Sequence, residues 1–141
     1  SKVTNMDGMF SGCNGLTTLD LSSMSTNNVT DMEYMFSWCR NLTTLNVSRW
    51  DTSNVKDMSG VFSGCESLTM LDMSSWNTQN VTSMNSIFNL CTSLSTLTTG
   101  VNFKFIGTDY ELPGTWQNSA GETFTSGNFP SNVADTYTRI S

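Results

Sequence analysis

The sequence contains no histidine, and only 6 of its 141 residues are basic. A surface that binds nucleic-acid phosphates needs clustered lysine and arginine, so scattered basic side chains and a net charge of −6 argue against that partner. No run of about 18 apolar residues occurs, which argues against a membrane-spanning helix. Apolar residues still make up 37 % of the chain, too many for a disordered segment. We therefore expect a folded domain with a polar, largely uncharged surface.

A repeat of 26 residues runs without a gap from residue 3 to residue 100. Shifting the chain by 26 aligns seven apolar columns. These columns are Val3, Val29, Val55 and Val81; Met6, Met32, Met58 and Met84; Met9, Met35, Val61 and Ile87; Phe10, Phe36, Phe62 and Phe88; Cys13, Cys39, Cys65 and Cys91; Leu16, Leu42, Leu68 and Leu94; and Leu19, Leu45, Leu71 and Leu97. A period of this length predicts a solenoid, in which units too small to fold alone cover one another.

Each unit combines two periodicities. In "MEYMFSWCRNLTTLNV", residues 32–47, the apolar spacing first predicts a short helix, and then Leu45 and Val47 alternate as in a strand. We therefore expect an α/β solenoid over residues 1–100, with the first of its four repeats incomplete. It would be a right-handed, leucine-rich-repeat-like coil with short helices on one side and a parallel β-sheet on the other.

The pattern stops near residue 101, and residues 101–141 contain neither methionine nor cysteine. Alternating apolar residues after 101, a Ser-Ala-Gly turn in "TWQNSAGETFT" and the segment "ADTYTRI" predict several short strands. An array of repeats needs a different sequence to cover its end. We expect residues 101–141 to be a β-rich C-terminal cap or a small appended module.

The four cysteines occupy one column, so their side chains point the same way on neighbouring units. A disulfide needs side chains directed at each other, and we therefore expect buried free thiols. With no histidine and no Cys-x-x-Cys pair, the sequence predicts neither a metal site nor a cofactor. A second polar column, Asn28, Asn54 and Asn80, predicts turn amides that bond neighbouring units.

The outward side of the predicted strands is the candidate surface for partner binding. Its positions are Thr18 and Asp20, Thr44 and Asn46, and Met70 and Asp72. Met70 stands where the other units carry threonine, which marks it as a contact residue. Trp50 and Trp76 follow the strands in one column. These tryptophans either pack in a stack at the turn or form an aromatic platform for a partner.

Enzymatic activity is not expected. Without histidine, acid–base catalysis would fall to carboxylates, lysine or tyrosine. Asp20 and Asp72 lie at equivalent outward positions about 9.5 Å apart, at about 4.8 Å per strand, a separation that an inverting glycosidase could use. These positions recur because the repeat recurs, so we interpret them as a solvated face.

The columns also resemble a known family. The elements "NVTDM", "MFSWC" and "LDMSSWNT", in this order and spacing, are similar to the 26-residue repeat of BspA-like leucine-rich-repeat surface proteins of bacteria. The resemblance covers about residues 3 to 100, and the tail is similar to segments that follow such repeats in Gram-positive surface proteins. It implies an extracellular protein attached to the cell surface by segments outside this chain, which would be a fragment of a longer one.

Two functions remain open. The first is a non-enzymatic binding module that uses the strand face for adhesion or for recognition of a host or matrix protein or a glycan. The alternative is a passive spacer that presents another domain away from the cell wall. We expect no contact with nucleic acid and no direct insertion into a membrane.

Overall fold

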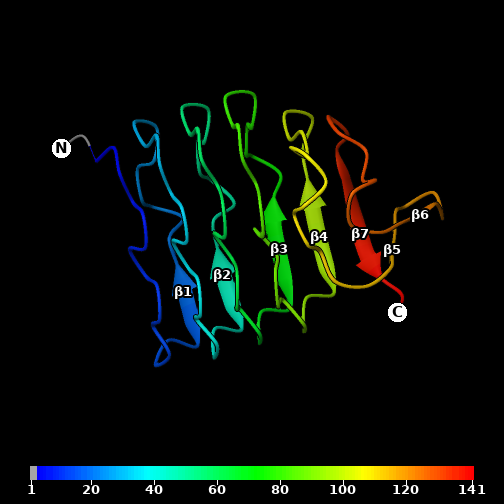
Figure 1. The fold of residues 1–141 in the computed structure, drawn as a ribbon, viewed down its shortest axis with the longest axis horizontal. Helices are drawn as coiled ribbons and strands as arrows, with labels where there is room; N and C mark the ends of the chain where they lie inside the picture. Colours follow the sequence, from blue (N-terminus) through cyan, green and yellow to red (C-terminus); the bar gives the residue numbers. More distant parts are fainter. Residues whose placement is uncertain (1–2) are drawn as a thin grey trace.

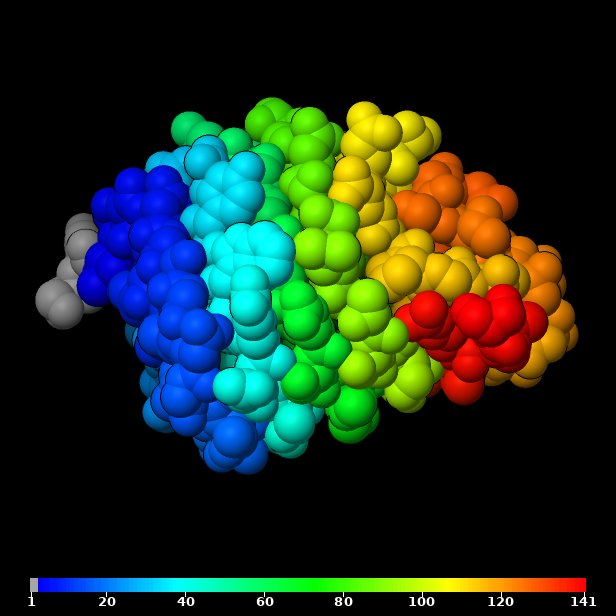
Figure 2. All heavy atoms as spheres, turned by 60° about the horizontal axis from the view of Figure 1, so that its bottom comes forward, coloured from blue at the N-terminus to red at the C-terminus, as the bar shows by residue number. Residues whose placement is uncertain are grey.

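The computed structural model describes residues 3–141 and contains seven strands (Figure 1). They are β1 (Thr18–Asp20), β2 (Thr44–Asn46), β3 (Met70–Met73), β4 (Thr96–Thr99), β5 (Trp116–Gln117), β6 (Thr123–Phe124) and β7 (Asp135–Arg139). We name the repeat units by residues: unit 1 (3–26), unit 2 (27–52), unit 3 (53–78) and unit 4 (79–100). The units lie side by side in sequence order, and residues 101–141 lie at the far end from unit 1 (Figures 1 and 2).

The predicted helices are absent, and the prediction of an α/β solenoid is wrong. The strands are joined by turns and irregular segments, and no residue from 3 to 141 is helical. In unit 2 the N–H of Phe36 donates to the carbonyl of Val61 in the next unit, at 2.9 Å, and not to a residue four positions earlier. The N–H of Cys39 closes a turn on the carbonyl of Phe36, at 3.2 Å. Bonds within a unit therefore alternate with bonds between units.

Two left-handed residues in each unit explain why no helix forms. Positive φ recurs in two columns, Gly8, Tyr34, Gly60 and Ser86, and Gly12, Trp38, Gly64 and Leu90. A right-handed helix requires negative φ, so each of these residues interrupts one. The resulting chain of turns still directs the methionine, phenylalanine, cysteine and leucine columns inward, and these side chains are buried in units 2 to 4. These turns therefore place apolar residues at the same sequence spacing as a helix would, which is why the pattern predicted a helix.

Strands occur near Leu19, Leu45, Leu71 and Leu97, where the alternating segment of each repeat predicts them, but they do not form one sheet. β1 pairs with β2 in parallel, with Leu19 opposite Leu45. β3 pairs with β4 in parallel, with Leu71 opposite Leu97, inside a five-stranded sheet of order β3-β4-β7-β5-β6. A second line of parallel contact joins Asn5, Asp31, Asp57 and Ser83 of successive units. Both lines keep the 26-residue register.

Stacked aromatic rings form the centre of the core. The rings of Phe10, Phe36, Phe62 and Phe88 lie nearly parallel, with successive centroids 5.5, 5.8 and 6.2 Å apart. Trp50 and Trp76 stack beside them at 6.0 Å. Offset stacking of this kind adds about 0.5–1.5 kcal/mol per pair beyond the area that each ring buries. Because the units keep one register, equivalent aromatic residues of successive units stack on one another.

The cysteine column consists of free thiols, as predicted. Cys39, Cys65 and Cys91 are buried and Cys13 is half-buried. The Sγ atoms of the three buried thiols donate to the carbonyls of Phe10, Phe36 and Phe62, at 3.0, 3.2 and 3.1 Å. Burial raises the pKa of Cys91 to about 12 and raises the pKa of Cys39 and of Cys65, which disfavours the reactive thiolate.

The asparagine column also behaves as predicted. The side-chain amide of Asn54 donates to the carbonyl of Asn27, and that of Asn80 to the carbonyl of Ser53, at 2.6 and 2.7 Å. Each bond spans 27 residues and so joins neighbouring units. The bonds satisfy turn carbonyls that would otherwise need water.

Residues 101–141 take the place of a next unit beside unit 4. The N–H groups of Ser86 and Phe88 donate to the carbonyls of Asp109 and Tyr110, at 2.8 and 3.1 Å. β7 adds antiparallel to β4, with Tyr137 opposite Leu97. The division at residues 100 and 101 into repeats and a cap or module stays a prediction. Within residues 3–141 no helix is long and apolar enough to cross a membrane.

Bulky side chains of unit 2 cover glycines of unit 3. A Cβ added to Gly60 would overlap the ring of Tyr34, and one added to Gly64 would overlap the ring of Trp38. Tyr34 and Trp38 are themselves left-handed, at φ 54° and 61°, and stay about half exposed. The glycines thus provide both a left-handed backbone and the space in which the rings lie.

We predict that Gly60→Ala destabilises the fold more than Gly8→Ala. Both residues have φ near +62°, so both variants meet the left-handed penalty of about 1–2 kcal/mol. Of these two glycines, only Gly60 lies under a ring, that of Tyr34. Displacing this ring adds about 1–3 kcal/mol to the cost of Gly60→Ala. Urea unfolding of the two variants measures the difference. In a Tyr34→Gly background, Gly60→Ala should cost no more than Gly8→Ala, and equal costs in the wild-type background would contradict the packing.

Candidate partner-binding surface

The outward face of the strands brings six of the eight predicted site residues onto one surface. Register pairs Thr18 with Thr44 and Asp20 with Asn46. In the second sheet Met70 pairs with Thr96 and Asp72 with Thr98. Thr18, Asp20, Thr44, Met70 and Asp72 are exposed, and Asn46 is half-buried. Met70 exposes 54 % of its surface, which is unusual for a large apolar side chain inside a strand.

The two tryptophans do not belong to this surface. Trp50 and Trp76 are 1 % and 0 % exposed. Their indole N–H groups donate to the carbonyls of Leu21 and Val47 in the preceding units, at 3.0 and 3.2 Å. Of the two alternatives drawn from the sequence, the tryptophans form the stack. An aromatic platform for a partner needs exposed ring faces, which these two buried residues do not have.

Three of the candidate residues have a structural role at the strand ends. The Oδ1 atoms of Asp20, Asn46 and Asp72 accept the N–H of the residue two positions on, at 3.0, 3.1 and 3.0 Å. This turn ends each strand in the same way. At Asp20, hydrogen bonds from the Ser22 side chain and then its N–H lower the carboxyl pKa, so the turn favours the charged form. The sequence did not reveal this role.

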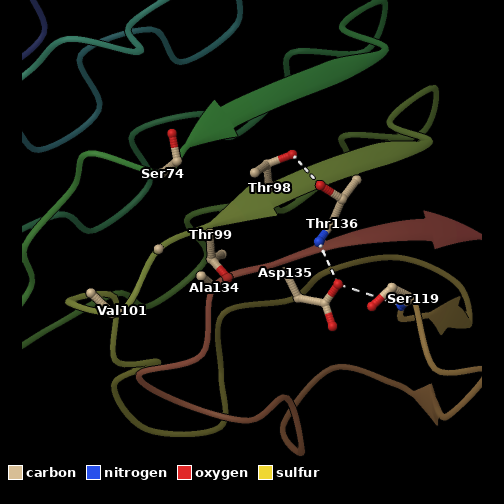
Figure 3. Close-up of a pocket in the computed structure, with 9 residues that line it drawn as sticks. Ser74, Thr98, Thr99, Val101, Ser119, Ala134, Asp135 and Thr136 are labelled. Carbon is tan, nitrogen blue, oxygen red and sulfur yellow. Dashed lines mark hydrogen bonds between the residues drawn. The ribbon is translucent and has the colours of Figure 1, made fainter.

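The face ends in a shallow hollow between the repeats and the tail (Figure 3). Its volume is about 550 Å³, and it lies over the ends of β4 and β7 and the residues beside them. Ser74, Thr98, Thr136 and Ser119 bring hydroxyl groups to it, and Val101 brings an apolar side chain that is 61 % exposed. Hydroxyl groups both donate and accept, so the hollow suits polar, uncharged groups.

Asp135 is the one carboxylate among the lining residues of the hollow, and none of them is basic. It accepts the N–H of Thr136 at 2.8 Å and the N–H of Ser119 at 3.4 Å. Beside it the hydroxyls of Thr98 and Thr136 share a hydrogen bond of 3.1 Å across β4 and β7. Sequence reasoning missed the contribution of β7, because antiparallel pairing over 38 residues leaves no periodic signal.

Carboxylates also gather along the other line of inter-unit contact. Asp31 and Asp57 are bridge partners, and Glu33 lies beside Asp57. A hydrogen bond with Asp57, then the negative charge of Asp57, raises the pKa of Glu33 to about 7, with Asp7 and Asp31 adding to the effect. No group of three potential ligands within residues 3–141 has the geometry to hold a metal ion. The nearby charge of Asp57 therefore favours the protonated form of Glu33.

We predict that Glu33 makes stability depend on pH. A glutamate pKa of about 7 in the fold, against 4.5 for the free side chain, means that the native state holds the extra proton between these values. Stability should therefore fall as pH rises from about 4.5 to about 7. Glu33→Gln should flatten this slope, because a neutral amide can donate to Asp57 at every pH.

Unfolding in urea at a series of pH values checks this prediction, with the exposed Glu111→Gln as the matched control. The control should keep the wild-type slope. An unchanged slope in Glu33→Gln would show that Glu33 does not hold the extra proton.

Comparison with known proteins places the chain in a family. A family model described as "Mycoplasma protein of unknown function, DUF285" matches residues 1–106. No curated protein and no solved structure matches the chain significantly. The family match covers 106 of the 141 residues and includes all four repeat units. The chain therefore belongs to this Mycoplasma family, DUF285, whose function is unknown.

Proposed function

We propose that the chain is a non-enzymatic, extracellular binding module of a bacterial surface protein that recognises a protein or glycan through its strand face. The family match supports a repeat protein. The motifs "NVTDM", "MFSWC" and "LDMSSWNT" support the narrower BspA-like relationship. Attachment to the cell by segments outside residues 1–141 is part of the proposal.

The observation that carries the proposal is the outward face itself. It comprises two parallel pairs, β1 with β2 and β3 with β4, and it continues from β4 onto β7, where Thr138 lies opposite Thr96. Met70 lies opposite Thr96, and its exposed thioether side chain can fill irregular gaps in a partner. Extended faces of repeat proteins are suited to partners that span several units.

The hollow beside Thr98 and Thr136 gives this face a concave end. Its volume of about 550 Å³ lies within the range of sites that hold small groups. Its single carboxylate and hydroxyl lining would accept a neutral or weakly basic group and repel an anion. A glycan, or a polar side chain of a protein partner, fits this chemistry.

One observation favours the alternative, a passive spacer. Asp20, Asn46 and Asp72 are explained by their turns without any partner. A spacer would tolerate any polar residue at the remaining outward positions. The test must therefore change residues that have no role in the turns.

We predict that the double variant Thr44→Lys, Met70→Lys loses binding and keeps its fold. Both side chains are exposed on neighbouring strands, and neither makes a side-chain hydrogen bond within residues 3–141. Two lysines at the centre of the face should weaken a true complex by about tenfold or more. Binding of wild type and variant to an array of extracellular-matrix proteins and glycans measures the effect.

Gln79→Lys, Asn85→Lys is the matched control, because it adds the same charge at exposed positions outside the strands and the lining of the hollow. Loss of a wild-type interaction in the strand-face variant alone would support the binding module. Equal loss in both variants would indicate a charge effect. An array on which folded wild-type protein binds nothing would favour the spacer.

A further inference from the structure

Two aromatic side chains of unit 2 are exposed, unlike every other tyrosine and tryptophan of the chain. Tyr34 and Trp38 expose 50 % and 40 % of their surfaces, whereas the remaining tyrosines and tryptophans are at most 1 % exposed. The segment that carries the two rings, light blue to cyan, lies on the face that Figure 2 shows. It consists of turns and belongs to none of the strands. The two rings are therefore a surface feature separate from the strand face.

Both residues adopt a backbone conformation that suits glycine. The φ angle is 54° at Tyr34 and 61° at Trp38, and left-handed backbone is uncommon for bulky side chains. Units 1 and 3 carry glycine at both equivalent positions. Because glycine adopts this φ without strain, the turns themselves do not require the two rings. Strained residues of this kind gather at sites that bind ligands, which points to a role for the rings outside the fold.

Unit 3 supports both rings from one side. The ring of Tyr34 lies against Gly60 and the ring of Trp38 lies against Gly64, and both glycines are buried. The backbone N–H groups of the two aromatic residues donate to serine carbonyls of unit 3, at 2.9 and 2.7 Å. The exposed part of each side chain is therefore the part that faces away from its glycine.

Polar groups lie on both sides of the two rings along the chain. The guanidinium of Arg40 lies over the ring of Trp38, 5.1 Å from its centroid, as cation–π attraction favours. This guanidinium forms no ion pair and no hydrogen bond within residues 3–141, so its N–H groups can donate to a ligand. The carboxyl group of Glu33 lies directly before Tyr34 and beside Asp57, and it can accept.

We propose that Tyr34, Trp38 and Arg40 form an aromatic shelf that binds a neutral oligosaccharide. A pyranose ring has apolar C–H groups on its faces and hydroxyl groups around its edge. One sugar unit would stack on the open side of Tyr34, and the next would accept hydrogen bonds from the Arg40 guanidinium that Trp38 holds. The shelf is a second site, which goes beyond the strand face and its hollow.

The charges beside the shelf favour an uncharged ligand with many hydroxyl groups. Glu33 and Asp57 would repel an anion, and Arg40 would repel a cation. A purely apolar ligand would cover the rings and leave Arg40 without a partner. A sugar hydroxyl both donates and accepts, so it can bond to the guanidinium and to the carboxyl group of Glu33.

NMR titration of the isotopically labelled chain with cellotetraose, N-acetylchitotetraose and mannotetraose tests the proposal. Trp38 is the reporter, because the indoles of the other tryptophans are buried. We expect at least one of these oligosaccharides to shift the indole N–H signal of Trp38 and the ring signals of Tyr34, and to leave the other indole signals in place. A panel in which no oligosaccharide shifts these signals would overturn the proposal.

Glycine variants separate binding from folding. Tyr34→Gly and Trp38→Gly introduce the residue that units 1 and 3 already carry, so both should keep the fold. Each should weaken oligosaccharide binding by about tenfold or more, whereas Tyr34→Phe should preserve it because the ring remains. Leu90→Gly is the matched control, since Leu90 is left-handed and 42 % exposed in the same column as Trp38 but carries no ring. Equal binding in the wild type and in the glycine variants would contradict the shelf.

Arg40→Ala tests the shelf independently of the left-handed positions. This exposed side chain can be shortened without a change of the core, and its loss should weaken the same titration. Unchanged binding in Arg40→Ala, with either glycine variant unfolded, would show that the rings are structural and would overturn the proposal. So would a peptide of repeated Pro-Pro-Gly that shifts the Trp38 signal where no oligosaccharide does. The strand-face variant Thr44→Lys, Met70→Lys should bind the oligosaccharide as the wild type does, so the two proposals can fail separately.

Discussion

The hydrogen-bond ladder between neighbouring units is the constraint on which the rest of the structure depends. Alternate N–H groups of one unit donate to carbonyls 25 residues later, as Phe10 does to Met35 and Phe36 to Val61. This spacing disfavours insertions in the bonded segment, because one extra residue there would shift the bonds of that unit with its neighbours out of register. The 26-residue period of the sequence, which contains no gap, is consistent with that constraint.

The ladder places equivalent side chains of successive units directly beside each other. The arrangement stabilises apolar columns, since Phe36 stacks between Phe10 and Phe62 and each of the three buried thiols donates to a carbonyl of the unit before it. A column of charged residues would be destabilising, because like charges become neighbours, as Asp31 and Asp57 do. The low charge of the chain and its many threonines and asparagines follow from the same geometry.

The sequence was sufficient for many features that depend on register, although it predicted one parallel sheet where the structure has two. The apolar columns, the strands near Leu45 and Leu71, the free thiols and the amide bonds of Asn54 and Asn80 all follow from the period alone. The helices were wrong because the turns share the helical spacing of apolar residues. Gly60 and Gly64 lie inside the predicted helix, and they could have indicated turns, since glycine readily adopts positive φ.

The candidate surface was only partly accessible to sequence reasoning. Thr18, Thr44 and Met70 lie outward because strands alternate, and this alternation is visible in the sequence. Trp50 and Trp76 repeat at the 26-residue period, but the sequence left open whether they are buried, and their contacts with carbonyls of the preceding unit decide it. The hollow depends on β7 meeting β4, a contact that leaves no periodic trace, so only the structure reveals it.

The most direct test of the account is the scalar coupling across hydrogen bonds, measured by NMR on isotopically labelled protein. The ladder predicts a coupling from the amide nitrogen of Phe36 to the carbonyl carbon of Val61, and from Phe62 to Ile87. A helix would instead couple Phe36 to Met32 and Phe62 to Met58. Couplings to the next unit would establish the ladder, and couplings four residues back would contradict it.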